Sequence, residues 1–170
     1  MVAALPEYLL VCETRLDEDD QHHWRFSLET ITGQTVIEAN DHEPCDLNRL
    51  ALLSVVRGLE ALDGPSCVTM MCSNRYVIHG LRNGLSGWRE TQFTWDHFGR
   101  MVPIPNADLW RRVDRALDIH QVSTCWLSAT FLSQGGTADR LPETRRAPLD
   151  RIRKWLAGQA IAEQPTFAVA

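Results

Sequence analysis

The chain has 170 residues, of which 44% are hydrophobic and 23% charged, a composition typical of one globular domain. Its formal net charge of −5 argues against a protein that relies on broad attraction to phosphate, although a local basic stripe would still suffice. No apolar run approaches the roughly 20 residues that span a bilayer, and the first residues lack the basic leader of a signal peptide. We therefore expect a cytoplasmic protein with no membrane partner, and we interpret its five cysteines as reduced thiols.

The first 72 residues carry the patterns of four strands and one helix. Continuous apolar runs, or alternation of apolar and polar residues, predict strands over residues 8–12, 24–29, 35–39 and 67–72. Residues 14–23 are polar and are interpreted as a loop, whereas Gly33 marks the turn of a hairpin. Asp46 is a good N-cap for a helix over residues 47–62. The strand–helix–strand order implies that the strand after this helix runs parallel to the first one.

The second half predicts three further helices and one further strand. Ser73 and Asn74 are expected to cap a helix that extends to about Asn83, after which the small residues at 84–87 loosen the chain. An aromatic and charged segment without an assigned element follows, and Asn106 is expected to cap the next helix. The remaining predictions are a strand over 122–127, a flexible loop over 128–146, a final helix from Pro148 and a loose tail over 164–170. This order predicts a single α/β domain over residues 1–163, with a five-stranded mixed sheet flanked by helices in three layers.

Three segments resemble the ribonuclease H family. NRLALLSVVRGLEAL (48–62) is similar to the family's first helix, and SNRYVIHGL (73–81) to the end of its central strand and the next helix. VPIPNADLWRRVDRAL (102–117) is similar to its helix with an Asp-Leu-Trp motif. The resemblance covers about residues 7–158. It implies the ribonuclease H-like fold and hydrolysis of RNA in RNA–DNA hybrids, with two Mg²⁺ ions held by four carboxylates.

The positions that match these carboxylates keep two of them at best. Glu13 matches the Asp of the first strand and Asp150 that of the last helix, whereas Ala51 and Ser73 stand where the family has Glu and Asp. A site that should balance four positive charges has thus lost two negative ones. We predict no catalytic residue. We expect Glu13 and Asp150 to be weak metal ligands, and we expect no cofactor.

Residues matching the family's substrate-binding positions are partly retained. Those that we expect to contact nucleic acid are Asn48, Arg75, Trp88, Arg89 and Trp95. The last three match the family's basic handle segment, and for Trp88 and Trp95 packing is an alternative role. Four other tryptophans are expected to pack in the core, namely Trp24, Trp110, Trp126 and Trp155.

Two functional hypotheses follow from the resemblance and its departures. The first is a ribonuclease H-like protein without hydrolase activity, kept as a binding module for RNA–DNA hybrid, other nucleic acid, a protein partner or a second copy of itself. The alternative is a weakly active, metal-dependent hybrid endonuclease. It would use Mg²⁺ or Mn²⁺ with Glu13, Asp150 and an acid from residues 17–20.

Overall fold

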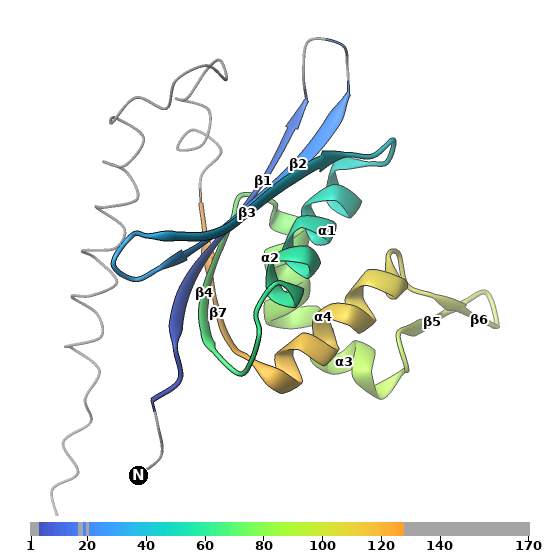
Figure 1. Cartoon of the computed structure of the whole chain (residues 1–170). Coiled ribbons are helices and arrows are strands. Elements are labelled where there is room, and N and C mark those ends of the chain that lie inside the picture. Colours follow the sequence, from blue (N-terminus) through green and yellow to red (C-terminus); the bar gives the residue numbers. More distant parts are fainter. Residues whose placement is uncertain (1–3, 17–18, 20, 128–170) are drawn as a thin grey trace, which may run out of the picture. The chain divides into compact units, whose positions relative to one another are not determined.

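The computed structural model describes residues 4–16, 19 and 21–127 (Figure 1). Its strands are β1 (Glu7–Leu16), β2 (His22–Thr30), β3 (Thr35–His42), β4 (Cys67–Cys72), β5 (Thr94–His97), β6 (Arg100–Pro103) and β7 (Gln121–Trp126). Its helices are α1 (Leu47–Glu60), α2 (Arg75–His79), the π-helical turn η1 (Gly80–Gly84), α3 (Leu85–Glu90) and α4 (Ala107–Ile119). The predicted loop over 128–146, the final helix with Asp150 and Trp155, and the tail over 164–170 lie outside the described residues. None of the described helices is long and apolar enough to cross a membrane.

Five strands form one mixed sheet in the order β3-β2-β1-β4-β7. The first three strands pair antiparallel, and β4 lies parallel to both β1 and β7. The prediction of a five-stranded mixed sheet is therefore confirmed. The register pairs Cys12 of β1 with Cys72 of β4, so Glu13 and Ser73 follow at neighbouring positions of the two strands.

The described helices form a layer on one face of this sheet (Figure 1). Most residues of α1 are buried, because the helix packs against β1 and β2 on one side and α4 on another. Asp46 accepts hydrogen bonds from the backbone amides of Asn48 and Arg49, as predicted for its N-cap. The five cysteines are free thiols, and two of them, Cys12 and Cys72, are buried in the core.

The predicted loop over residues 14–23 is largely wrong, because β1 continues to Leu16 and β2 begins at His22. Polar side chains pair across these strands, which lets the ladder extend beyond the apolar runs. The alternation expected in β2 is also incomplete. Ser27 and Glu29 are buried, and the Ser27 hydroxyl donates to Glu29 Oε1 at 3.2 Å.

The small residues at 84–87 do not loosen the chain, contrary to our expectation. The helix continues through η1 and α3 to Glu90. Gly80 and Gly84 have no Cβ, and the rings of Trp110 and Trp88 pack directly against this part of the helix. The close approach of these indoles stabilises the helical course that glycine would otherwise weaken.

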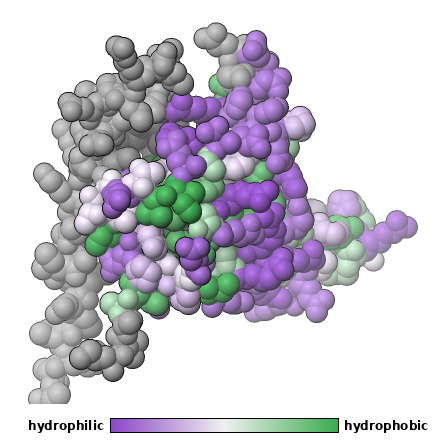
Figure 2. Space-filling view, in the orientation of Figure 1, coloured by the Kyte–Doolittle hydropathy of each residue, from purple (hydrophilic) through white to green (hydrophobic). Residues whose placement is uncertain are grey.

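The aromatic segment after Glu90 is not irregular but forms a hairpin of β5 and β6 that projects from the helical layer (Figure 1). Phe98 and Gly99 make its turn, both with positive φ. The hairpin carries hydrophobic surface among hydrophilic neighbours (Figure 2), with Trp95 50% and Phe98 95% exposed.

Candidate functional site

Three of the four positions that we predicted to match the family's carboxylates, Glu13, Ala51 and Ser73, lie in β1, in α1 and directly after β4. Ala51 lies on α1 and is only 2% exposed, and its carbonyl oxygen accepts a hydrogen bond from the Ser54 hydroxyl at 2.7 Å. Cys12, which precedes Glu13, is buried beside Ser54 and Cys72, and this burial raises the pKa of the Cys12 thiol well above its usual value. Ala51 and Cys12 thus both belong to the buried core of the protein.

Glu13 is held by two arginines. Its Oε2 lies 3.4 Å from Nη1 of Arg25 and 3.8 Å from Nη2 of Arg15, and the side chain is 15% exposed. Arg25 also binds Glu38 of β3, donating from Nε to Oε1 at 2.8 Å. Glu13 lies beyond the strand predicted over residues 8–12, but β1 continues to Leu16 and the register places Arg25 directly opposite Glu13.

The described residues do not fit the two-metal centre that the resemblance implies. Ala51 has no ligand atom and Ser73 offers only a neutral hydroxyl, whereas Mg²⁺ is bound through carboxylates. In the part of the chain that the structure describes, no group of three or more His, Cys, Asp or Glu side chains could hold a metal ion. Asp150 lies outside that part, so its pairing with Glu13 remains a prediction.

Three asparagines lie near the N-terminal ends of α1, α2 and α4, and we call them the amide cluster. Asn74 Nδ2 donates to Asn48 Oδ1 at 3.0 Å, while Asn74 Oδ1 caps α2 by accepting from the amide of Val77. Asn106 Oδ1 accepts from Arg49 Nη1 at 3.1 Å. The structure thus adds Asn74 and Asn106 to the predicted Asn48. Asn74 was identified from the sequence only as a cap.

Asn106 does not cap α4 with its side chain, contrary to our prediction. The residue has a left-handed backbone with φ 57°, and its amide turns toward α1 and α2 instead. Its Nδ2 donates to the hydroxyl oxygen of Tyr76 at 3.2 Å, which also accepts from Trp110 Nε1 at 2.8 Å. The Tyr76 hydroxyl in turn donates to the carbonyl of Pro105 at 3.1 Å.

An ion pair ties α1 to the first turn of α4 beside the amide cluster. Arg49 donates from Nη1 and Nη2 to the two carboxylate oxygens of Asp108, at 3.0 and 2.7 Å. These hydrogen bonds lower the pKa of Asp108 and raise that of Arg49. This bidentate geometry helps fix the spacing of the two helices that present Asn48 and Asn106.

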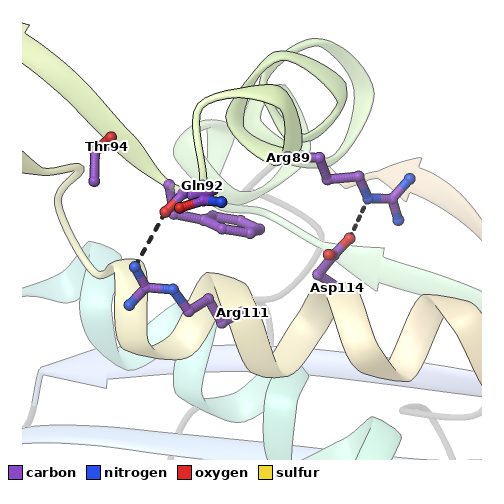
Figure 3. Close-up of a pocket in the computed structure, with 6 residues that line it drawn as sticks. Arg89, Gln92, Thr94, Arg111 and Asp114 are labelled. Carbon is purple, nitrogen blue, oxygen red and sulfur yellow. Dashed lines mark hydrogen bonds and ion pairs between the residues drawn. The ribbon is translucent and has the colours of Figure 1, made fainter.

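The predicted handle residues Trp88 and Arg89 make internal contacts. Trp88 is half-buried, with its ring centroid 5.0 Å from that of Trp110. Arg89 pairs with Asp114 at one side of a surface pocket of about 440 Å³ (Figure 3). At its other side Arg111 donates to the carbonyl of Gln92 at 3.1 Å (Figure 3).

The other predicted contact residues, Arg75 and Trp95, are exposed. Trp126, which we expected in the core, is also exposed, and the guanidinium of Arg75 lies 5.5 Å from its ring centroid. Trp126 is the last residue of β7, and β7 is the last strand in the order of the sheet. This position at the edge explains the error. Trp24 and Trp110 are buried as predicted.

Comparison with known proteins assigns the family. No family model matches the chain. A ribonuclease H from Jannaschia sp. (strain CCS1) is 35% identical over 130 residues, which are 74% of this chain and 81% of that protein. The chain belongs to the ribonuclease H family. A ribonuclease H from Rhodospirillum rubrum is 40% identical over 84 residues, about half the length of each protein at 49%.

Solved structures of the ribonuclease H family confirm the predicted fold. LC9-RNase H1, a type 1 ribonuclease H with the type 2 active-site motif, superposes with a TM-score of 0.60 at 19% identity, covering 75% of this chain and 65% of that one. LC11-RNase H1, solved in complex with RNA/DNA hybrid, gives a TM-score of 0.50 at 9% identity, covering 75% and 90%. At these identities the likeness concerns the fold alone.

Proposed function

We propose that this member of the ribonuclease H family binds RNA–DNA hybrid without cleaving it. The observation that carries the proposal is the pairing of Glu13 with Arg25 and Arg15, at a site where Ala51 and Ser73 replace carboxylates. The charges of these two arginines already balance Glu13 and Glu38. The electrostatic attraction that brings two Mg²⁺ ions to the family's site is therefore lacking.

The amide cluster supports the binding part of the proposal. Side-chain amides both donate and accept hydrogen bonds, which suits the 2′-hydroxyl groups and phosphate oxygens of a hybrid. Asn48 is exposed and is held by Asn74, and the Arg49–Asp108 pair fixes the helix on which it stands. Hydrogen-bonded neighbours that hold a contact residue reduce the entropy lost on binding.

The direct test compares binding with cleavage on a labelled RNA–DNA hybrid. We expect saturable binding without metal, measured by fluorescence anisotropy, and no cleavage in Mg²⁺ or Mn²⁺ at saturating protein. Asn48→Ala should weaken binding, whereas Arg57→Gln, an exposed arginine in the last turn of α1, is the matched control. Absence of hybrid binding would refute the proposal. Metal-dependent cleavage that is lost in Glu13→Gln would establish the endonuclease alternative.

A restoration experiment tests whether Arg25 keeps the site closed to metal. The double variant Ala51→Glu/Ser73→Asp should bind Mn²⁺ weakly, because Glu13 stays paired with Arg25. Adding Arg25→Gln to that pair should increase Mn²⁺ affinity in a calorimetric titration, whether or not cleavage appears. Equal Mn²⁺ affinity of the double and triple variants would show that Arg25 has no such role. Circular dichroism checks the fold, since residue 51 is buried.

A protein partner is a second candidate function, favoured by the exposed apolar side chains of the β5–β6 hairpin. Phe98 and Met101 of this hairpin are 95% and 63% exposed, and the hairpin carries one acidic and one basic residue, Asp96 and Arg100. Exposed apolar surface of this kind marks contacts between proteins. Sedimentation of the wild type and of Phe98→Ser at several concentrations tests self-association through the hairpin. Identical monomeric behaviour would exclude a second copy as the partner.

A further inference from the structure

A second surface of the molecule, which includes no residue of the amide cluster, has the chemistry of a ligand-binding site. It is an open hollow of about 390 Å³ where α2 and η1 lie against the end of β7. The hollow is lined by Arg75, Ile78, His79, Arg82, Asn83 and Trp126. These lining residues include two arginines and no carboxylate, in a chain of net charge −5.

Neutral groups hold one arginine of the hollow, and the described residues give neither arginine an acidic partner. Arg82 donates from Nε to the hydroxyl oxygen of Thr124 and from Nη2 to its carbonyl, both at 2.9 Å, so neutral groups hold it in place. Within the described residues, no carboxylate lies within ion-pair distance of Arg75 or Arg82. Five other described arginines are each paired with a carboxylate, namely Arg15, Arg25, Arg49, Arg89 and Arg112.

An exposed aromatic ring completes the hollow. Trp126 is 45% exposed although it is large and apolar, and Arg75 lies over its ring. His79 and Asn83 add polar nitrogens, with Asn83 Nδ2 3.1 Å from His79 Nδ1. Within the described residues, this indole face lies beside guanidinium groups that have no carboxylate partner. The arrangement suits a nucleic-acid base and its phosphate, because every base has a π-face and every linkage one negative charge.

We propose that this hollow binds one unpaired nucleotide of a single-stranded segment, with the base stacked on Trp126 and the backbone phosphate paired with Arg75 and Arg82. Arg75 follows Asn74 of the amide cluster directly in the chain, so the two surfaces adjoin. The inference rests on the proposed function in one respect. The single strand is expected to be a continuation of the hybrid that the amide cluster holds.

The test measures anisotropy with three probes: a blunt RNA–DNA hybrid, the same hybrid with a short single-stranded DNA overhang of either polarity, and the free single strand. Base–aromatic stacking is strong enough for one overhang to tighten binding about tenfold over the blunt hybrid. Trp126→Ala should abolish this gain, whereas Trp126→Phe should keep most of it. Arg82→Gln should reduce the slope of log affinity against log salt by about 0.7, and Arg57→Gln should leave it unchanged.

The outcomes separate this inference from the proposed function. If blunt hybrid binds but the overhang adds nothing, or if the gain survives Trp126→Ala in a folded variant, the inference is overturned and the proposed function stands. If overhang and free single strand bind through Trp126 while blunt hybrid does not, the proposed function fails and the inference stands. Displacement of the single strand by an equal concentration of an acidic peptide would assign the hollow to a protein ligand and overturn the inference.

Discussion

Gly80→Ala is expected to destabilise the protein although it replaces glycine by the best helix former. Gly80 begins η1, and a Cβ built there would collide with the indole of Trp110 and lie 3.2 Å from the ring of Trp88. Trp110 is fully buried, and its Nε1 donates to the Tyr76 hydroxyl at 2.8 Å. The indole therefore cannot move aside without breaking this hydrogen bond and its packing against Trp88.

The magnitude follows from two opposing effects. Alanine in place of glycine inside a helix contributes about 1 kcal/mol of stability through backbone entropy. Overpacking a well-filled core costs about 1–3 kcal/mol, and loss of the Trp110 hydrogen bond costs about 1 kcal/mol more. The balance is a net destabilisation of about 1–3 kcal/mol. In a domain of this size, each 1 kcal/mol corresponds to a fall in Tm of about 2–4 °C.

The assay is urea unfolding followed by tryptophan fluorescence, with Gly87→Ala as the matched control. Gly87 lies in α3, seven residues further along the same helical stretch, and a Cβ there would meet no atom within 4 Å. Gly87→Ala should therefore stabilise the protein by about 0.5–1 kcal/mol. If both alanine variants are stabilised alike, the close packing of Trp110 on Gly80 is not present in solution and the reasoning is refuted.

Two further variants test the electrostatics around the site. Asp108→Asn should cost about 0.5–1 kcal/mol at neutral pH, because the pair with Arg49 is partly exposed. Arg49 lowers the pKa of Asp108, so this difference in unfolding free energy should close as the pH falls from about 4 through the folded pKa; a pH-independent difference would contradict the pairing. Glu13→Gln should destabilise by about 1 kcal/mol, since Arg25 loses a partner. A stabilised Glu13→Gln protein would instead indicate a repulsive carboxylate site.

Elements whose sequence carries a strong local pattern were predicted well. The sheet order around β1 and β4 followed from a strand–helix–strand pattern, and α1 from the spacing of its apolar residues and the Asp46 cap. Gly84 and Gly87 misled the prediction after residue 83, where the chain stays helical to Glu90. There, Trp88 packs on Gly84 from one turn further along, and its ring lies 5.0 Å from that of the distant Trp110, a contact that no local pattern reports.

For the candidate site, the sequence predicted which residues occupy it but not which residues they contact. The resemblance located Glu13, Ala51 and Ser73, but the partners of Glu13 depend on the register of β1 and β2. A signal for that register existed, because a hairpin centred on residue 19 pairs Leu16 with His22 and Glu13 with Arg25. Because we predicted a loop over residues 14–23, we did not consider strand pairing there. The amide cluster was missed because its members are distant in sequence and meet only through tertiary packing.

The arginine contacts of Glu13 follow physically from Ala51 and Ser73, which stand where the resemblance implies carboxylates. A two-metal site collects carboxylates that repel one another until the cations arrive, so each ligand costs stability in the metal-free protein. With Ala51 and Ser73 at the other two positions, no carboxylate there repels Glu13. The half-buried Glu13 still needs a positively charged partner to offset the cost of its desolvation. A cross-strand guanidinium then becomes its most favourable partner, and Arg25, already bound to Glu38, takes that place. Glu13 thus helps to join β1, β2 and β3 through Arg25.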